Sequence, residues 1–120
     1  MQINYNQLSE NKKVLQFTEG CYPVEFNRQR KWIWTSKEFG GIIENVEVLS
    51  LTIETDVDNK LYYEDLDMDL NPDCLNIISL PMKGKKEFSL SLEKDYDVPP
   101  DIRKLGVKII SVSVDGDVIF

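Results

Sequence analysis

The side chains best suited to binding chemistry are aromatic and gather in one short segment. Trp32 and Trp34 are two positions apart, so on a strand they share one face of the sheet. A flat indole attracts the C–H face of a sugar ring, and its N–H can donate to a hydroxyl. A solvent-facing pair therefore predicts a saccharide platform, and an inward-facing pair predicts two core residues. The aromatic residues of this segment are Tyr22, Phe26, Trp32, Trp34 and Phe39.

Charged side chains accompany these rings. Glu25, Arg28, Arg30 and Lys31 can accept from or donate to sugar hydroxyls, and the basic ones also suit an acidic sugar. We expect ring stacking plus hydroxyl hydrogen bonds at a shallow site, with weak affinity. The predicted ligand-binding residues are Tyr22, Glu25, Arg28, Arg30, Trp32 and Trp34.

Acidic residues form a second cluster, in which Asp65, Asp67 and Asp69 alternate with apolar residues. Oxygen-rich clusters can hold calcium, but the spacing of an EF-hand loop is not met. We therefore expect a solvated sheet face and no bound metal. The calcium alternative would use Asp56, Asp58, Asp65 and Asp67 as ligands.

Composition excludes several kinds of catalysis. The chain has no histidine, which removes Ser-His and Cys-His nucleophile pairs and histidine general bases. Among the 21 acidic residues, no spacing marks a carboxylate pair for glycoside hydrolysis. We expect a protein that is not an enzyme and uses no cofactor.

Charge and cysteine usage bear on partners and compartment. Fourteen basic and 21 acidic residues give a net charge of −7, which repels nucleic acid and anionic membranes. Cys21 and Cys74 are predicted to be reduced, buried thiols in a cytoplasmic protein, with a disulfide as the alternative. The chain has no 18-residue apolar run and no signal-peptide pattern at its start, which also favours the cytoplasm.

The residues that position these groups are typical of β-sheets. The 120-residue chain has no alanine, the best helix former, whereas it has 11 Ile, 10 Val and 4 Thr. Strict alternation of apolar and polar residues predicts strands with one dry and one wet face. The alternating apolar sets are Leu49/Leu51/Ile53, Leu66/Met68/Leu70, Phe88/Leu90/Leu92 and Ile110/Val112/Val114.

Apolar segments recur every 8 to 15 residues, with turn residues between them. This spacing predicts an antiparallel, jelly-roll-like β-sandwich of about eight or nine strands. A phase slip between Val48 and Leu49 predicts a β-bulge, and residues 99–105 predict one short helical turn. Residues 1–12 are expected to form a loose lead-in or a helical turn before a single domain, 13–120. Further strands are expected at 14–18, 31–35, 75–80 and 118–120.

Two segments resemble a known kind of module. The first runs from Gly20 through Tyr22 to Glu25 and continues at 34–38, and the second is the Asp-x-Arg-x-Leu-Gly pattern at 101–106. They are similar to small jelly-roll, carbohydrate-binding-like modules associated with bacterial glycosyltransferases and surface-polysaccharide proteins. In this chain Ile33 stands where those modules usually have arginine.

The resemblance implies a non-catalytic carbohydrate-binding or accessory module that works in polysaccharide synthesis or modification. The alternative is a protein-interaction or scaffold domain that self-associates or docks on a glycosyltransferase or another larger protein. An Asp and an Arg two apart can tie a short turn to the sheet, while a leucine fills the core and a glycine ends the turn. The residues that the resemblance singles out are Gly20, Tyr22, Glu25, Trp34, Asp101, Arg103, Leu105 and Gly106.

Overall fold

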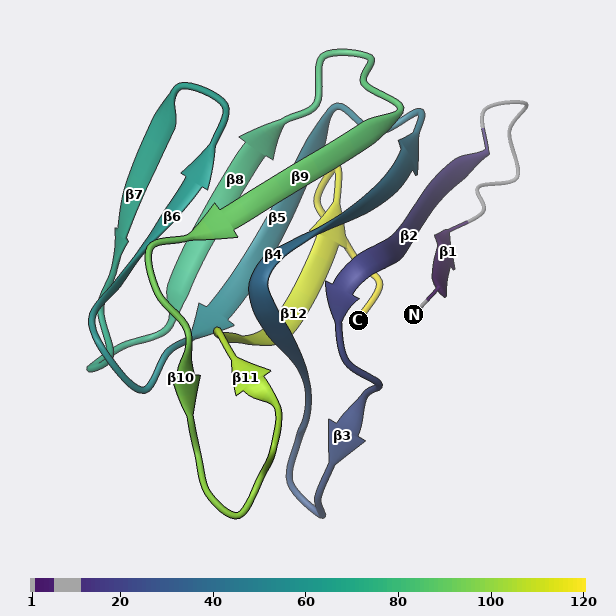
Figure 1. Cartoon of the computed structure of the whole chain (residues 1–120). Coiled ribbons are helices and arrows are strands. Elements are labelled where there is room, and N and C mark those ends of the chain that lie inside the picture. Colours follow the sequence, from purple (N-terminus) through teal and green to yellow (C-terminus); the bar gives the residue numbers. More distant parts are fainter. Residues whose placement is uncertain (1, 6–11) are drawn as a thin grey trace.

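The described part of the chain folds from β-strands, turns and loops. The computed structural model describes residues 2–5 and 12–120, and every regular element in these ranges is a strand (Figure 1). None of the described segments forms a helix long and apolar enough to cross a membrane. The strands are β1 (Gln2–Tyr5), β2 (Lys13–Cys21), β3 (Glu25–Phe26), β4 (Lys31–Glu44), β5 (Val48–Glu54), β6 (Asn59–Tyr63), β7 (Leu66–Leu70), β8 (Asn76–Pro81), β9 (Glu87–Leu92), β10 (Tyr96–Asp97), β11 (Lys104–Leu105), β12 (Lys108–Val114) and β13 (Asp117–Val118).

Eleven of these strands join one antiparallel sheet with the central order β7-β6-β9-β4-β12-β5-β8. Strand β4 connects its two halves: Ile33 and Trp34 pair with β12, whereas Glu38–Ile42 pair with β9. The sheet therefore curls into a nearly closed barrel, which confirms the all-β antiparallel prediction. The two strands β10 and β11 form a separate hairpin (Figure 1).

The inner face of the curled sheet holds the core. Leu49, Leu51 and Ile53 of β5 all point inward and are fully buried, as their alternation predicts. The alternating residues of β9 behave in the same way. Ile33 and Phe39 of β4 face the same core. Because successive strand residues point to opposite faces, the neighbours of Ile33 point away from this core.

The predicted helical turn at 99–105 is wrong. Asp101 donates its backbone N–H to Val98, and its Oδ1 accepts the N–H of Arg103 at 2.9 Å. These local bonds compete with a helix and produce a turn. The segment then continues as β11, where Lys104 and Leu105 pair with β10.

The β-bulge predicted between Val48 and Leu49 is absent, and a register shift occurs in another strand, β12. Asn45 adopts a positive φ of 58°, and the turn around it places Val46 in the core before β5 begins. The phase slip between Val48 and Leu49 therefore reflects the turn before β5 and not a β-bulge. A real register shift occurs in β12 between Ile109 and Ser111, so the inward residue is Ile109, and the predicted Ile110 is only half-buried.

The amino-terminal segment also differs from the prediction. Residues Gln2–Tyr5 form β1, which pairs antiparallel with β2, whereas a loose lead-in or helical turn was expected. The rest of the predicted lead-in, residues 1 and 6–11, lies outside the described residues.

Candidate functional site

The two tryptophans lie on the outer face of the sheet, away from the main core. Ile33 between them points into the core with its partner Ile109, so Trp32 and Trp34 point to the opposite side. The predicted shared face is therefore confirmed. Exposure separates the two rings, because Trp34 is only 8% exposed whereas Trp32 is half-buried.

Cations and one further ring surround these indoles. The Nζ of Lys108, which is the β12 partner of Trp34, lies 5.5 Å from the centroid of Trp32 and 5.0 Å from that of Trp34. The Arg30 guanidinium lies 5.6 Å from the Trp32 centroid. Tyr96 packs edge-to-face on Trp34, with centroids 6.5 Å apart, and the contact helps to close off that ring. We call Arg30, Trp32, Trp34, Glu54, Tyr96 and Lys108 the tryptophan face.

Glu54 binds both cations of the tryptophan face. Its two carboxylate oxygens accept from Arg30 at 2.7 and 2.9 Å, and Lys108 Nζ lies 3.5 Å from Oε1. The hydrogen bonds from Arg30 lower the pKa of Glu54 below its usual value, so this carboxylate is ionised at neutral pH. The carboxylate of Glu54 thus occupies the position between the two cations, beside the indoles.

Two polar groups at this face have distinct environments. The buried Nε1 of Trp32 has no hydrogen-bond acceptor among the described residues. The hydroxyl of Tyr96 donates to Asp56 at 3.1 Å, and burial together with this carboxylate raises the pKa of Tyr96 to about 12. The first group is a covered donor without a partner, whereas the second is already bonded.

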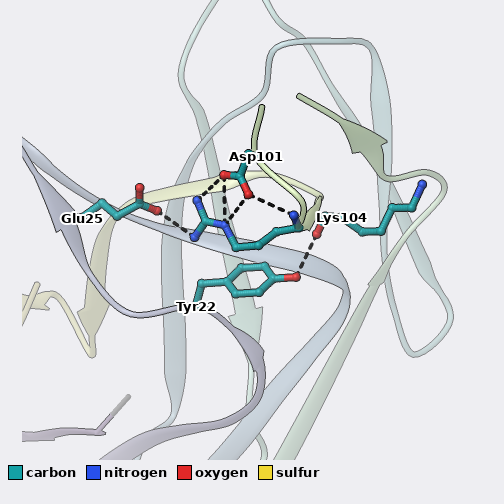
Figure 2. Close-up of polar contacts among 5 residues, drawn as sticks. Tyr22, Glu25, Asp101 and Lys104 are labelled. Atoms are coloured by element: carbon teal, nitrogen blue, oxygen red, sulfur yellow. Dashed lines mark hydrogen bonds and ion pairs between the residues drawn. The ribbon is translucent and has the colours of Figure 1, made fainter. Parts of the chain in front are cut away.

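The two segments singled out in the sequence, 20–25 and 101–106, meet at the side chain of Arg103. Its guanidinium donates to both oxygens of Asp101 at 2.6 to 3.0 Å and to Glu25 at 3.1 Å (Figure 2). It also lies 4.9 Å from the ring centroid of Tyr22, whose hydroxyl donates to the carbonyl of Lys104 at 3.0 Å. The bonds from Arg103 lower the pKa of Asp101 to about 2. We call Tyr22, Glu25, Asp101 and Arg103 the arginine cluster.

The remaining motif residues shape the backbone around this cluster. Gly20 has a φ of +72°, and a Cβ there would lie 1.8 Å from the carbonyl oxygen of Glu38. At Gly106 a Cβ would lie 2.5 Å from Leu92 Cδ1. Leu105 is buried, as the motif implies. Both glycines therefore permit close approaches that a larger residue would block.

The arginine cluster and the tryptophan face share one side of the sheet. Glu25 on β3 is the register partner of Trp32 on β4, and directly paired residues point to the same side. Tyr22 donates its backbone N–H to the carbonyl of Trp34. The structure thus brings together five of the six predicted ligand-binding residues. The sixth, Arg28, is exposed in the β3–β4 turn and has no ion-pair partner among the described residues.

Sequence reasoning missed three residues of this site, namely Glu54, Tyr96 and Lys108. Alternation had placed Glu54 on the wet face of its strand, which is correct. Its bond to Arg30 depends on the strand order β4-β12-β5, which the local sequence does not display. Tyr96 belongs to a two-residue strand with no periodic signal.

Two surface hollows bear on the tryptophan face: one shares Glu54 with it, and the other shares none of its residues. One of about 510 Å³ is lined by Glu54, Asp56, Asp73 and Cys74 among others. A larger one of about 1000 Å³ lies at the turns around Asn45 and Asp115. Neither tryptophan lines either of these two hollows.

The acidic cluster of the sequence analysis does not assemble a metal site in the described residues. Asp67 and Asp69 are exposed on β7, with Lys60 Nζ 3.9 and 3.7 Å from their carboxylates. Asp56 instead accepts from Tyr96, and Asp58 and Asp65 are at separate turns. No three acidic or thiol groups in the described ranges converge as metal ligands.

The two cysteines are both free. Cys21 is half-buried against the core, and burial raises the pKa of its thiol to about 12. Cys74 is exposed, which corrects the prediction of two buried thiols. Cys74 and Glu54 both line the 510 Å³ hollow.

No protein-family model matches this chain, and no curated protein or solved structure shows significant similarity to it.

Proposed function

We propose that the chain is a non-catalytic saccharide-binding accessory module and that the tryptophan face is its ligand surface. The observation that carries the proposal is the environment of Trp32. This indole lies half-buried outside the core, beside two cations, with an N–H that lacks an acceptor. An unpaired buried donor costs about 1–3 kcal/mol, which a ligand hydroxyl would recover.

The chemistry available at this face is hydrogen bonding and ring contact. Arg30 has five N–H donors and uses two in its bonds to Glu54, so others remain for hydroxyls. Lys108 adds further donors, and Glu54 is an acceptor. Because Tyr96 covers Trp34, the accessible ring is that of Trp32, and Trp34 serves to support it.

An NMR titration of the isotopically labelled chain with a panel of oligosaccharides tests this function. Binding predicts concentration-dependent shifts of the Trp32 indole N–H and of the Arg30 and Lys108 amides. The W32F variant removes the donor but keeps a ring, and its affinity should fall about two- to thirteenfold, since one neutral hydrogen bond contributes about 0.5–1.5 kcal/mol. The R28A variant, in the turn between β3 and β4, is the control. Absence of shifts with the whole panel would remove the proposal.

A second function, docking on another protein, has its own observation. Phe26 is 79% exposed and Ile102 is 97% exposed, and both lie on hairpins that extend to the same end of the molecule (Figure 1). The bond between Glu25 and Arg103 joins these two hairpins. Exposed apolar groups on a fixed surface favour a protein partner.

Light scattering at several concentrations separates self-association from docking on a larger enzyme. If the hairpin ends pair two copies, the F26S/I102S double variant is monomeric where the unmodified chain is dimeric. The resemblance suggests a glycosyltransferase as the larger partner and a jelly-roll sandwich as the fold. The free cysteines favour the cytoplasm as the compartment. A monomer at all concentrations would leave docking on another protein as the form of this second function.

A further inference from the structure

Each cation of the tryptophan face and of the arginine cluster already has a carboxylate partner within the chain. Glu54 binds Arg30 through two hydrogen bonds and lies beside Lys108. Arg103 is bound by Asp101 and Glu25. An incoming carboxylate would therefore have to compete with Glu54 for both Arg30 and Lys108.

The surroundings of the tryptophan face add negative charge. Glu54, Asp56 and Asp73 all line the adjoining hollow of about 510 Å³, and no lysine or arginine lines it. The whole chain carries a net charge of −7. Like charges brought together at a binding surface cost several kcal/mol, so such surroundings discriminate against anions.

A neutral hydroxyl meets a different environment at the same atoms. Because Glu54 occupies only two of the five N–H groups of Arg30, the others can still donate to a hydroxyl. Pairing with Glu54 weakens the attraction for an anion but keeps the hydrogen-bond donors.

We propose that this surface selects neutral saccharides over acidic ones and that Glu54 is the residue that sets the selectivity. The inference rests on the saccharide binding proposed above and adds the class of ligand to it. Glu54 acts as an internal carboxylate that holds Arg30 and Lys108 against the indoles and excludes a second carboxylate. The specificity thus comes from repulsion between Glu54 and an acidic sugar as well as from hydrogen bonds to the hydroxyls of a neutral one.

Matched pairs of oligosaccharides test this selectivity directly. The neutral members are tetrasaccharides of glucose, galactose and mannose, and the acidic members are the corresponding uronates, which differ only by carboxylates at C6. Affinities are measured by NMR titration at two salt concentrations. The chain should bind at least one neutral member about tenfold or more tightly than its uronate, a difference of about 1.4 kcal/mol.

The E54Q variant then identifies the residue responsible. Freeing Arg30 and Lys108 should raise the affinity for the matching uronate about tenfold, with a gain that shrinks as salt increases, and should change neutral binding much less. The control is D69N, which makes the same change in net charge at a side chain that is 86% exposed on β7. A urea unfolding curve checks that E54Q is folded.

The outcomes separate the two proposals. If no saccharide of either kind binds, the proposed function and this inference both fail. If the uronate binds the unmodified chain as tightly as its neutral partner, saccharide binding stands and the selectivity is overturned. If D69N raises uronate affinity as much as E54Q, net charge and not Glu54 sets the preference.

Discussion

Arg103 and Glu25 lie 78 positions apart in the chain and meet at 3.1 Å on the outer side of the sheet. Asp101 and the ring of Tyr22 contact the same guanidinium. Four residues of the two segments singled out in the sequence, Tyr22, Glu25, Asp101 and Arg103, are therefore partners of one another. Their first role is to fix the β10–β11 hairpin beside β3, next to the tryptophan face.

Replacing Arg103 should destabilise the fold. The R103K variant keeps the charge but loses the planar, two-pronged contact with Asp101, and we expect a loss of about 1–3 kcal/mol in the free energy of unfolding. Urea denaturation measures it. The matched variant R28K, at an exposed residue of the neighbouring turn, should change stability by less than about 0.5 kcal/mol. Equal effects of the two variants would show that the arginine cluster adds no stability.

The arginine cluster should also make stability depend on pH. The pKa of Asp101 is about 2 in the folded chain, below its ordinary value of 3.8, because Arg103 binds the ionised form. A lowered folded-state pKa gives stability that is fully present above about pH 4 and is lost as pH falls toward 2. The stability difference between the unmodified chain and D101N should therefore shrink over that interval. A difference that stays constant from pH 5 to pH 2 would contradict the assigned ion pair.

Gly20 should tolerate no side chain. The G20A variant combines a φ of +72° with a Cβ placed 1.8 Å from the Glu38 carbonyl oxygen. The matched control is G84A, where φ is +73° and no atom lies within 4 Å of the added Cβ. G84A should cost about 1 kcal/mol for backbone strain, and G20A should cost clearly more, because strands must move apart. Thermal unfolding of both variants measures the difference, and equal costs would rule out the close approach.

How far the sequence alone predicts this fold depends on the kind of interaction that fixes each element. Alternation correctly orients Leu49, Leu51 and Ile53, because inward and outward residues of a long strand differ in polarity. It does not find β10 or β11, whose two residues are strands only because they pair with each other. It also misplaces Ile110, since the register shift in β12 arises from pairing with β5.

The candidate site was predictable to a similar extent. Spacing alone puts Trp32 and Trp34 on one face, and composition puts charged residues near them. The burial of Trp34 was not predictable, because Tyr96 reaches it from a distant hairpin. The bond from Arg30 to Glu54 likewise depends on which strands are neighbours.

The thiols should react at very different rates. Cys74 is exposed, whereas burial raises the pKa of Cys21 to about 12 and leaves it almost entirely as the unreactive thiol at neutral pH. Iodoacetamide should therefore add one label to the folded chain, on Cys74, and two labels in denaturant. Peptide mass mapping identifies the site. Rapid labelling of Cys21 in the folded chain would contradict its environment.

The two tryptophans should separate stability from binding. Trp34 is buried under Tyr96, so W34A should cost about 3–5 kcal/mol of stability. W32F removes an N–H that has no acceptor in the described structure, and it should leave stability unchanged or raise it by up to about 1 kcal/mol. Urea unfolding followed by circular dichroism measures both. If W32F instead costs as much as W34A, then Trp32 is needed for folding, and its unpaired N–H is no longer evidence for a ligand.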